Sequence, residues 1–345
     1  MNQEWFSPLT SQGLATDGDN FGQTTEELQA THRVATIAPL LDSGLIRVGG
    51  ADARLFLHNL LTNDIANLAT DSCRLAGLCS AKGRLLALMR IWRDGDDYLL
   101  LLPRDILPGI LKKLAMYILR SKVKLSDASA ERALIGIAAP AAALSSTVPS
   151  APTFAALPPI PARGVAHSNG AQLIRLDETR WILACAHDQA LTRWQELRVH
   201  ASPVGLAAWR ALEIAAAEPR VVAATQEAFV PQMLNLELPA LAGVSFNKGC
   251  YPGQEIVART QYLGKIKRRT YRAHVDSDAP PGAAVYASTM GDQACGALIS
   301  IAPSLQGGFD ALVCLQSNAV AAGTVRLGSV DGPTLQFLPS PYPLD

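Results

Sequence analysis

Apolar and polar residues follow a similar order in two blocks of the chain. The first block gives a strand, a helix, three strands, a second helix and a closing strand, at residues 45–48, 51–61, 74–80, 84–92, 98–102, 104–119 and 122–125. The second block gives three strands followed by a helix, at residues 164–167, 171–176, 181–185 and 187–200. The recurrence of strand, turn, strand, turn, strand and helix predicts two related α+β halves.

The pattern changes beyond residue 262. Short alternating runs are separated there by turns rich in Gly and Pro, and such runs predict a small β-barrel. Residues 1–30 are polar and show no regular period, so we expect a loosely held arm. The expected organisation is an N-terminal arm (1–30), a first α+β domain (31–130), a second α+β domain (131–260) and a C-terminal β-barrel domain (261–345).

Composition and charge exclude several classes of protein. Hydrophobic residues make up 49% of the chain and charged residues 17%, which is too apolar for a disordered protein. Thirty Lys+Arg balance thirty Asp+Glu, so no global field attracts nucleic acid or a membrane surface. No apolar run approaches the length of a spanning helix, and the first thirty residues carry acids without Lys or Arg. We therefore expect a cytoplasmic protein with no membrane partner.

The cysteines and histidines form no pattern typical of a metal site. There is no C-x-x-C pair and no Cys/His cluster with zinc or iron–sulfur spacing, so we expect reduced thiols, mostly in cores, and no metal ligands. The sequence also lacks a dinucleotide fingerprint, a phosphate loop, a nucleophile elbow and a zinc-protease helix. The six cysteines are Cys73, Cys79, Cys185, Cys250, Cys295 and Cys314.

Residues 248–259 have the sequence KGCYPGQEIVAR, which is typical of a reactive cysteine site. The Pro-Gly pair suits the centre of a type II turn, so Cys250 is expected at a sharp bend. The cations of Lys248 and Arg259 would favour its thiolate form, whereas Glu255 would oppose it unless paired with a cation. The alternative is a structural bend that holds a buried free cysteine.

Trp209 and Glu213 lie four residues apart on a predicted helix and share one of its faces. An indole beside a carboxylate suits a flat heterocycle with an amino-amide edge, because the ring can stack and the carboxylate can accept two N–H bonds. The alternative is a core tryptophan with Glu213 bonded to Arg210 or Arg220.

Residues 259–272 contain six cations and no acid, interleaved with two tyrosines. Such a segment is typical of a site for phosphates or a polyanion, and alternatively of a solvated strand edge. The cations are Arg259, Lys265, Lys267, Arg268, Arg269 and Arg272.

The eight-residue core KGCYPGQE at 248–255 resembles the signature of the YgfZ-type folate-binding proteins, which are relatives of the aminomethyltransferase (T protein) of the glycine cleavage system. Residues 209–217 and the short segments between 229 and 246 are similar to the stretch that leads to this signature. CSAKGR at 79–84 and GAD at 50–52 resemble parts of the family's first domain. The resemblance covers roughly residues 40–345.

This resemblance implies a ring of three domains around a central channel that binds tetrahydrofolate, with the first α+β domain taking part in folate binding. It also implies a link to the biosynthesis or repair of iron–sulfur enzymes, including one that thiomethylates tRNA. Cys250 is the functional thiol that it implies, and Lys248 and Arg259 are the candidate neighbours of that thiol. The candidate folate-binding residues are Trp209, Glu213, Gln254 and Glu255.

The sequence departs from the T proteins at two positions. Ile110 stands near the position of their catalytic Asp, and Asp105 is close but out of register. Without that carboxylate, aminomethyl transfer lacks its acid/base partner, which argues against a T-protein type of enzyme. Ser43 stands where some relatives carry a second aromatic residue. The leading hypothesis is thus a folate-dependent accessory factor; the alternatives are a one-carbon transferase and an RNA-binding module that uses residues 259–272.

Overall fold

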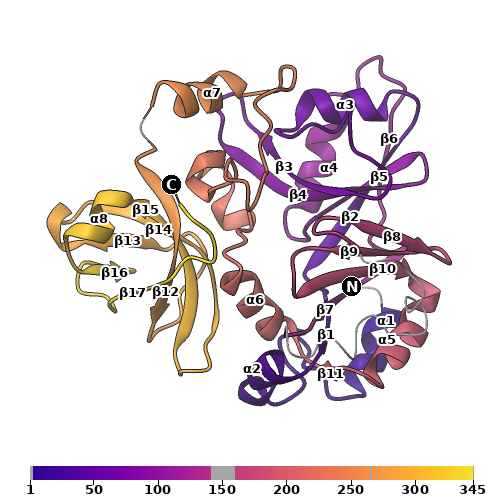
Figure 1. The fold of residues 1–345 in the computed structure, drawn as a ribbon, viewed down its shortest axis with the longest axis horizontal. Helices are drawn as coiled ribbons and strands as arrows, with labels where there is room; N and C mark the ends of the chain where they lie inside the picture. Colours follow the sequence, from indigo (N-terminus) through magenta and orange to yellow (C-terminus); the bar gives the residue numbers. More distant parts are fainter. Residues whose placement is uncertain (1–2, 141–159, 265, 345) are drawn as a thin grey trace.

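The computed structural model describes residues 3–140, 160–264 and 266–344. The protein is a mixed α+β structure with three sheets, and its C-terminal sheet lies beside the two N-terminal ones (Figure 1). None of the helices in these described ranges has the length and apolar character that crossing a bilayer requires.

The first sheet is antiparallel and has the strand order β3-β4-β5-β2-β6. Helices α3 (Ala53–Leu60) and α4 (Leu107–Ala115) pack on it, because the apolar residues of each helix fall on one face and join the strands in a common core. The predicted strands of the first block are found within a few residues of their expected ends. They are β2 (Ser43–Gly49), β3 (Cys73–Cys79), β4 (Leu85–Asp94), β5 (Asp97–Pro103) and β6 (Lys124–Asp127).

The second sheet has the strand order β11-β1-β7-β10-β9-β8. Helices α1 (Gln3–Thr10) and α5 (Ala190–Arg198) pack against it, and a further core joins it to the first sheet through residues such as Trp92 and Ile182. The strands are β1 (Thr36–Pro39), β7 (Arg132–Ala138), β8 (Val165–Ser168), β9 (Ala171–Arg175), β10 (Arg180–Ala186) and β11 (Ser202–Pro203).

The N-terminal residues differ from the expected loose arm, and that expectation was wrong. Trp5 and Leu9 are buried, and Trp5 packs edge-on against Trp194 of α5 with ring centroids 5.8 Å apart. Helix α2 (Thr24–Arg33) follows, and its Leu28 enters the core between the sheets. The physical reason is that a few well-placed apolar residues bury enough surface to hold a mostly polar segment.

Strand β1 also departs from the order along the chain. It precedes the first sheet in sequence but pairs with β7 and β11 of the second sheet. Membership of the two sheets therefore does not follow the expected division between residues 31–130 and 131–260.

The third sheet has the strand order β16-β13-β14-β15-β12-β17 and forms a half-barrel, where the sequence pattern predicted a small barrel. Helix α6 (Leu206–Ala215) lies between this sheet and the other two, and it contacts β14 and β15 (Figure 1). The strands are β12 (Arg268–Val275), β13 (Ala284–Ala287), β14 (Ala294–Pro303), β15 (Phe309–Gln316), β16 (Val325–Leu327) and β17 (Gln336–Leu338).

The remaining helices are short. Helix α7 (Gln254–Tyr262) precedes the third sheet, and α8 (Ser317–Ala322) lies within it. Single 3-10 turns lie at His187–Gln189, Ala223–Thr225, Pro231–Leu234 and Ser288–Met290.

Candidate functional site

The segment that carries Cys250 is fixed to the turn between β3 and β4. Gly253, the residue before α7, has a φ of 79°, which favours glycine. A Cβ added to it would meet the carbonyl oxygen of Ser80 and would lie 2.6 Å from the Cα of Gly83. On the other side of this contact, Ile256 of α7 packs against Gly83. Two segments far apart in sequence, 79–84 and 248–256, therefore form one surface.

Cys250 is exposed on this surface, whereas the other five cysteines are buried. The alternative of a buried free cysteine therefore does not hold at this position. Burial raises the pKa of the Cys79 and Cys314 thiols to about 12 and that of Cys185 to about 11. Those three thiols stay protonated at neutral pH and are poor nucleophiles.

Lys248 lies between the Cys250 bend and helix α3. Its Nζ donates a hydrogen bond to the carbonyl of Leu61 (2.8 Å) and sits 4.6 Å from the ring centroid of Tyr251. Burial lowers the pKa of Lys248 to about 8, although the charges of Asp64 and Cys250 act to raise it. The Lys248 side chain is therefore mostly in its charged ammonium form at neutral pH, and this charge lies next to the thiol of Cys250.

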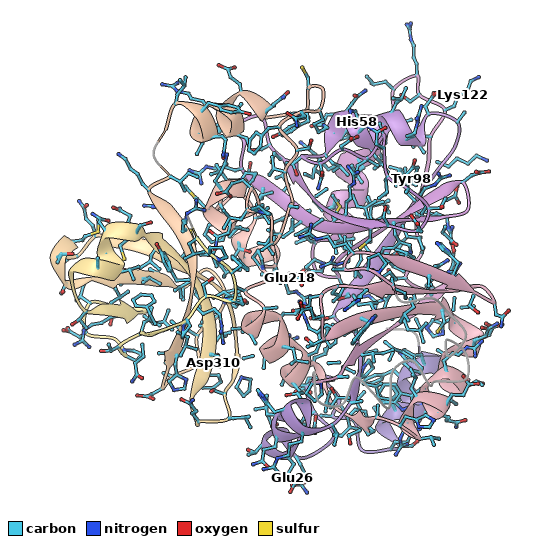
Figure 2. All side chains as sticks on the ribbon, viewed as in Figure 1. Glu26, His58, Tyr98, Lys122, Glu218 and Asp310 are labelled. Atoms are coloured by element: carbon cyan, nitrogen blue, oxygen red, sulfur yellow. The ribbon has the colours of Figure 1, made fainter. Side chains whose placement is uncertain are left out.

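His58 belongs to the same neighbourhood and was not predicted from the sequence. It lies on α3, labelled in Figure 2, and its Nε2 is 3.9 Å from the position of a Cβ on Gly249. Burial and the charge of Lys248 lower the pKa of His58, against the opposing effect of Asp64, whose Oδ1 is 3.2 Å from Nδ1. No local sequence signal links His58 to residue 250, because the contact forms only when α3 meets the bend.

Gln254, Glu255 and Arg259 lie on α7. Glu255 and Arg259 are exposed and share a helix face at a spacing of four residues, while Gln254 is half-buried. None of the three lines the large cavity beside α6. This placement differs from the expectation that Gln254 and Glu255 contact folate there, because Gly253 starts α7 at the β3–β4 turn.

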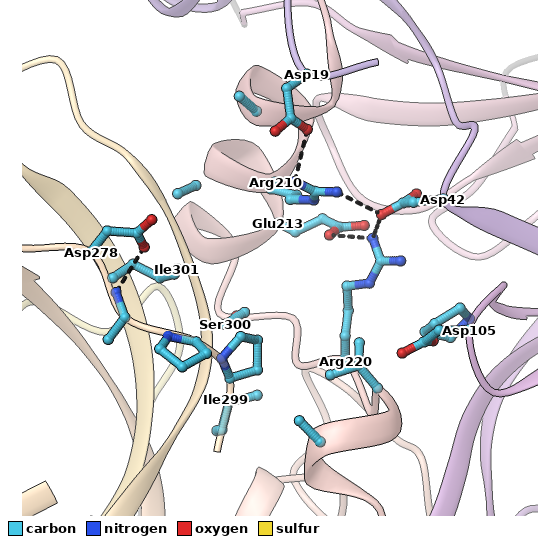
Figure 3. A pocket seen from close by; sticks show the side chains of 18 of the residues that line it. Asp19, Asp42, Asp105, Arg210, Glu213, Arg220, Asp278, Ile299, Ser300 and Ile301 are labelled. Atoms are coloured by element: carbon cyan, nitrogen blue, oxygen red, sulfur yellow. Dashed lines mark hydrogen bonds and ion pairs between the residues drawn. The ribbon is translucent and has the colours of Figure 1, made fainter. Parts of the chain in front are cut away.

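A cavity of about 1130 Å³ lies beside α6, between the loop after β5 and strand β14 (Figure 3). One wall is mostly apolar, and the opposite wall is charged. The apolar wall includes Pro280, Pro281, Ile299, Ile301, Ala302 and Phe309, and the charged wall includes Asp19, Asp42, Asp105, Arg210, Glu213 and Arg220.

Arg220 is the centre of the charged wall. It lies 2.9 Å from Asp42 and 3.3 Å from Oε2 of Glu213, while Arg210 bridges Asp19 (3.0 Å) and Asp42 (3.4 Å), as Figure 3 shows. Burial acts to raise the pKa of Asp42, but Arg220 and Arg210 outweigh it and the pKa is lowered. Burial raises the pKa of Glu213, and Arg220 compensates only in part. Glu213 thus gains a proton more readily than Asp42 does.

Trp209 does not line this cavity. It is 2% exposed, and its ring packs on Gly136, where an added Cβ would lie 2.7 Å from the indole. Its Nε1 donates to Oε1 of Glu213 at 3.1 Å. The structure therefore corrects the expectation of an open stacking face and matches the alternative, a core tryptophan with Glu213 bonded to Arg220. The reason is that a glycine on β7 leaves space for the ring between the helix and the sheet.

Ile110 and Asp105 have opposite environments. Ile110 lies on α4 with 2% exposure and belongs to the core of the first sheet. Asp105 lines the cavity, and its Oδ2 accepts a hydrogen bond from the backbone N–H of Ala223 at 2.8 Å. A carboxylate is therefore present at this wall, five residues before the position that sequence comparison indicated. Ser43 lies outside the cavity lining and donates to Asp42 (3.1 Å).

Comparison with known proteins adds to this geometry. The GCVT N-terminal domain family matches residues 3–237. The chain belongs to the GCVT family. The tRNA-modifying protein YgfZ of Escherichia coli (strain K12) is 30% identical to it over 315 residues, which cover 90% of this chain and 94% of that relative. YgfZ of Shigella flexneri has the same identity and coverage. The resemblance to the YgfZ-type proteins is thereby confirmed.

The fold of this family member is shared with a solved T protein. The glycine cleavage system aminomethyltransferase T from Bartonella henselae superposes with a TM-score of 0.72, covering 99% of this chain and 97% of that chain at 15% identity. The expected T-protein-like α+β fold with a C-terminal β module is therefore confirmed.

The basic segment 259–272 is divided in the structure. Arg269 pairs with Glu237 at 2.7 Å, and Arg272 donates to the carbonyl of Pro339 at 3.0 Å, while Arg259 and Lys267 are exposed. Lys265 lies outside the described residues. Within residues 3–140, 160–264 and 266–344, no three His, Cys, Asp or Glu side chains gather closely enough to hold a metal ion.

Proposed function

We propose that this protein binds tetrahydrofolate or a derivative in the cavity beside α6 and serves the biosynthesis or repair of iron–sulfur enzymes, with Cys250 as its functional thiol. The observation that carries the proposal is the placement of Glu213. Its carboxyl is held by Trp209 and Arg220 at the wall of a large cavity whose other wall is apolar. Ligand sites of drug-sized molecules combine an apolar lining with a few fixed polar groups in this way.

The residues of the cavity fit a reduced folate. Each oxygen of Glu213 has one protein donor and keeps a further lone pair, so the carboxylate can accept two N–H bonds from the amino-amide edge of a pterin. The apolar wall at Ile299 and Ile301 suits the body of the ligand, and Arg104 supplies a cation for its carboxylate tail. A bound reduced folate carries or accepts one-carbon units.

Cys250 supplies the second part of the proposal. Its thiol is exposed at a bend, beside the Lys248 ammonium and close to the β3–β4 turn. An exposed thiol with a neighbouring cation is a site for nucleophilic or metal-binding chemistry. Because two relatives are named tRNA-modifying proteins, we include tRNA-modifying iron–sulfur enzymes among the proposed clients. The assembly machinery of such enzymes is a proposed partner, and the proposed location is the cytoplasm, where thiols remain reduced.

Titration with reduced folates tests the cavity. Glu213→Gln removes the charge that accepts the pterin edge, so we expect affinity for tetrahydrofolate to fall by about tenfold or more. Trp209→Phe keeps an aromatic ring, although a smaller one, and removes the donor to Glu213, so a smaller loss is expected. Glu26→Gln on the exposed surface of α2 is the matched control. Unchanged affinity in a folded Glu213→Gln protein would contradict the folate site.

A complementation experiment tests the thiol. In cells that lack the endogenous protein, Cys250→Ala should leave the fold intact and lower the activity of a dependent iron–sulfur enzyme. Asn247→Ala changes an exposed residue of the same loop and serves as the control. Full activity of the cluster enzyme with Cys250→Ala would remove Cys250 from the mechanism.

A one-carbon transferase is the second candidate, and the position of Asp105 favours it. Its carboxylate lies at the cavity wall, where it can act on a proton of a bound substrate. Turnover of an aminomethylated carrier protein with tetrahydrofolate, lost in Asp105→Asn, would support this function. If no turnover is detected, the transferase function is contradicted and the accessory function remains the proposal.

RNA binding by residues 259–272 has less support, because Arg269 is already paired with Glu237. Submicromolar tRNA binding at physiological salt, lost when Arg268 and Arg269 are neutralised, would be needed to support it.

A further inference from the structure

A second cavity, of about 460 Å³, lies on the first sheet beside the start of α3. Its walls come from the loop before α3, from α3 itself and from the hairpin that joins β4 to β5. It shares no lining residue with the first cavity, which lies beside α6, so it is a space that the proposed function does not use. The lining residues are Gly50, Ala51, Arg54, Arg93, Asp96 and Tyr98.

Arg93 of β4 contributes a guanidinium group with unused donors. It pairs across the strands with Tyr98, which is 4% exposed, and its guanidinium carbon lies 5.9 Å from the centroid of that ring. Among the described residues the group makes one hydrogen bond, from Nη2 to the carbonyl of Gly95 at 3.2 Å, and its Nε is buried without a partner. A guanidinium has five N–H donors, so a ligand oxygen would supply part of the missing hydrogen bonding.

Arg54 supplies a second guanidinium group, from α3. Its side chain is exposed and pairs with no Asp or Glu in the part of the chain that the structure describes. Asp96 is the acid of the lining, and its carboxylate is fully exposed and 3.9 Å from Arg93. The lining therefore has two cations and one carboxylate that faces solvent.

The loop before β6 brings a third cation next to this lining. The backbone N–H of Lys122 donates to Oδ2 of Asp52 at 2.6 Å, and its carbonyl accepts from the N–H of Asp52 at 3.3 Å. A Cβ added to Gly50 would collide with the same carbonyl, so Lys122 is fixed beside the cavity, and both Lys122 and Tyr98 are labelled in Figure 2. The side chain of Lys122 is exposed, and residues 106–126 contain five Lys or Arg and no Asp or Glu. The surface beside the cavity is therefore basic.

We propose that this second cavity binds a phosphate group, whose oxygens accept N–H bonds from Arg54 and Arg93 and whose charge faces Lys122. Guanidinium groups suit phosphate because they present two parallel N–H donors to its oxygens. Three cations against the carboxylate of Asp96 leave two positive charges, and a phosphate monoester carries nearly two negative ones. The same oxygens are presented by a small phosphorylated molecule and by the backbone of an RNA strand.

Calorimetric titration with inorganic phosphate tests the site. The unsubstituted protein should bind phosphate saturably, and Arg54→Gln and Arg93→Gln should each weaken binding about tenfold or more, because a charged hydrogen-bond donor is lost. Arg54 is exposed, so its substitution leaves the packing of the protein unchanged. Ala51→Glu keeps both arginines and adds a carboxylate at an exposed lining position, so it should abolish binding. Arg33→Gln removes an exposed charge on α2 and is the control.

Fluorescence anisotropy with a labelled oligouridylate at physiological salt distinguishes the two sources of the phosphate group. Binding that inorganic phosphate displaces and that Arg54→Gln weakens would assign the site to an RNA strand. Saturable binding of inorganic phosphate without binding of the oligouridylate would assign it to a small phosphorylated molecule. The proposal is overturned if inorganic phosphate does not bind saturably, or if Arg54→Gln or Ala51→Glu binds it as tightly as the unsubstituted protein does.

Discussion

The bend that carries Cys250 and the charged wall of the first cavity are held together in different ways. The bend is built from residues adjacent in sequence, and backbone conformation at Gly253 and contact with Gly83 fix it. The charged wall takes Asp19, Asp42 and Arg220 from segments that are far apart in sequence. A functional residue on a local bend can be recognised from a short motif, whereas a site assembled from distant segments needs the tertiary structure.

The charges of the two regions also differ in how much they contribute to stability. Cys250 and Arg259 face solvent, where charges interact weakly. Arg220 is largely shielded from solvent between two carboxylates, so removal of this cation leaves Glu213 without its ion-pair partner and Asp42 with Arg210 alone. Stability should therefore respond strongly to substitutions in the wall and weakly to substitutions of exposed side chains on the bend.

The largest effect is expected for Arg220→Gln. Loss of the guanidinium leaves the half-buried Glu213 without its ion-pair partner and leaves Asp42 with Arg210 alone, so the free energy of unfolding should fall by about 3 kcal/mol. Denaturant unfolding at neutral pH measures this change, with Arg33→Gln as an exposed control. If the free energy of unfolding falls no more than in the control, the ion pairs of Arg220 do not stabilise the charged wall.

Gly253→Ala should have the next largest effect. An alanine at this positive φ is strained by about 1–2 kcal/mol, and its Cβ would also collide with Ser80 and Gly83. Gly95→Ala is the matched control, because Gly95 has a φ of 63° but no atom within 4 Å of its added Cβ. A greater loss of unfolding free energy at Gly253 than at Gly95 measures the docking contact. Equal losses would mean that the bend is not locked to the β3–β4 turn.

A smaller effect is expected from Lys248 above neutral pH. Its pKa falls from 10.5 in the unfolded chain to about 8 in the folded one, so the unfolded chain binds more protons between these values. Stability should therefore rise with pH from about 8 to 10.5, and Lys248→Met should remove this rise. Competitive acylation followed by peptide mapping should give a midpoint for Lys248 near 8. A midpoint at the value of an ordinary lysine would contradict its burial beside Tyr251.

The smallest effect on stability is expected for Cys250→Ser, which changes one exposed atom. In the native protein a thiol reagent should modify one of the six cysteines rapidly, and the Cys250→Ser protein should lose that reaction. All remaining thiols should react after unfolding. Rapid modification of a second cysteine in the native protein would show that burial does not protect the other five thiols from the reagent.

Much of the fold was predictable because it depends on local patterns. The strands of the first sheet and helix α5 lie close to their predicted positions, since alternation and helical spacing report directly on buried faces. The N-terminal helices were missed, because α1 is held by Trp5 and Leu9 packing on residues nearly two hundred positions away. Strand β1 was likewise missed, because its four residues join a sheet whose other strands come much later.

The sequence by itself determined the family and the α+β class and predicted that Cys250 lies at a sharp bend, because a short motif on a tight turn needs particular residues in an unbroken order. Only the tertiary structure decided that Trp209 is a core residue supporting Glu213, and that Asp105, not Ile110, reaches the cavity. The reason is that burial and charge pairing depend on which segments meet. In this protein a glycine on β7 and an arginine after α6 determine how Trp209 and Glu213 are placed.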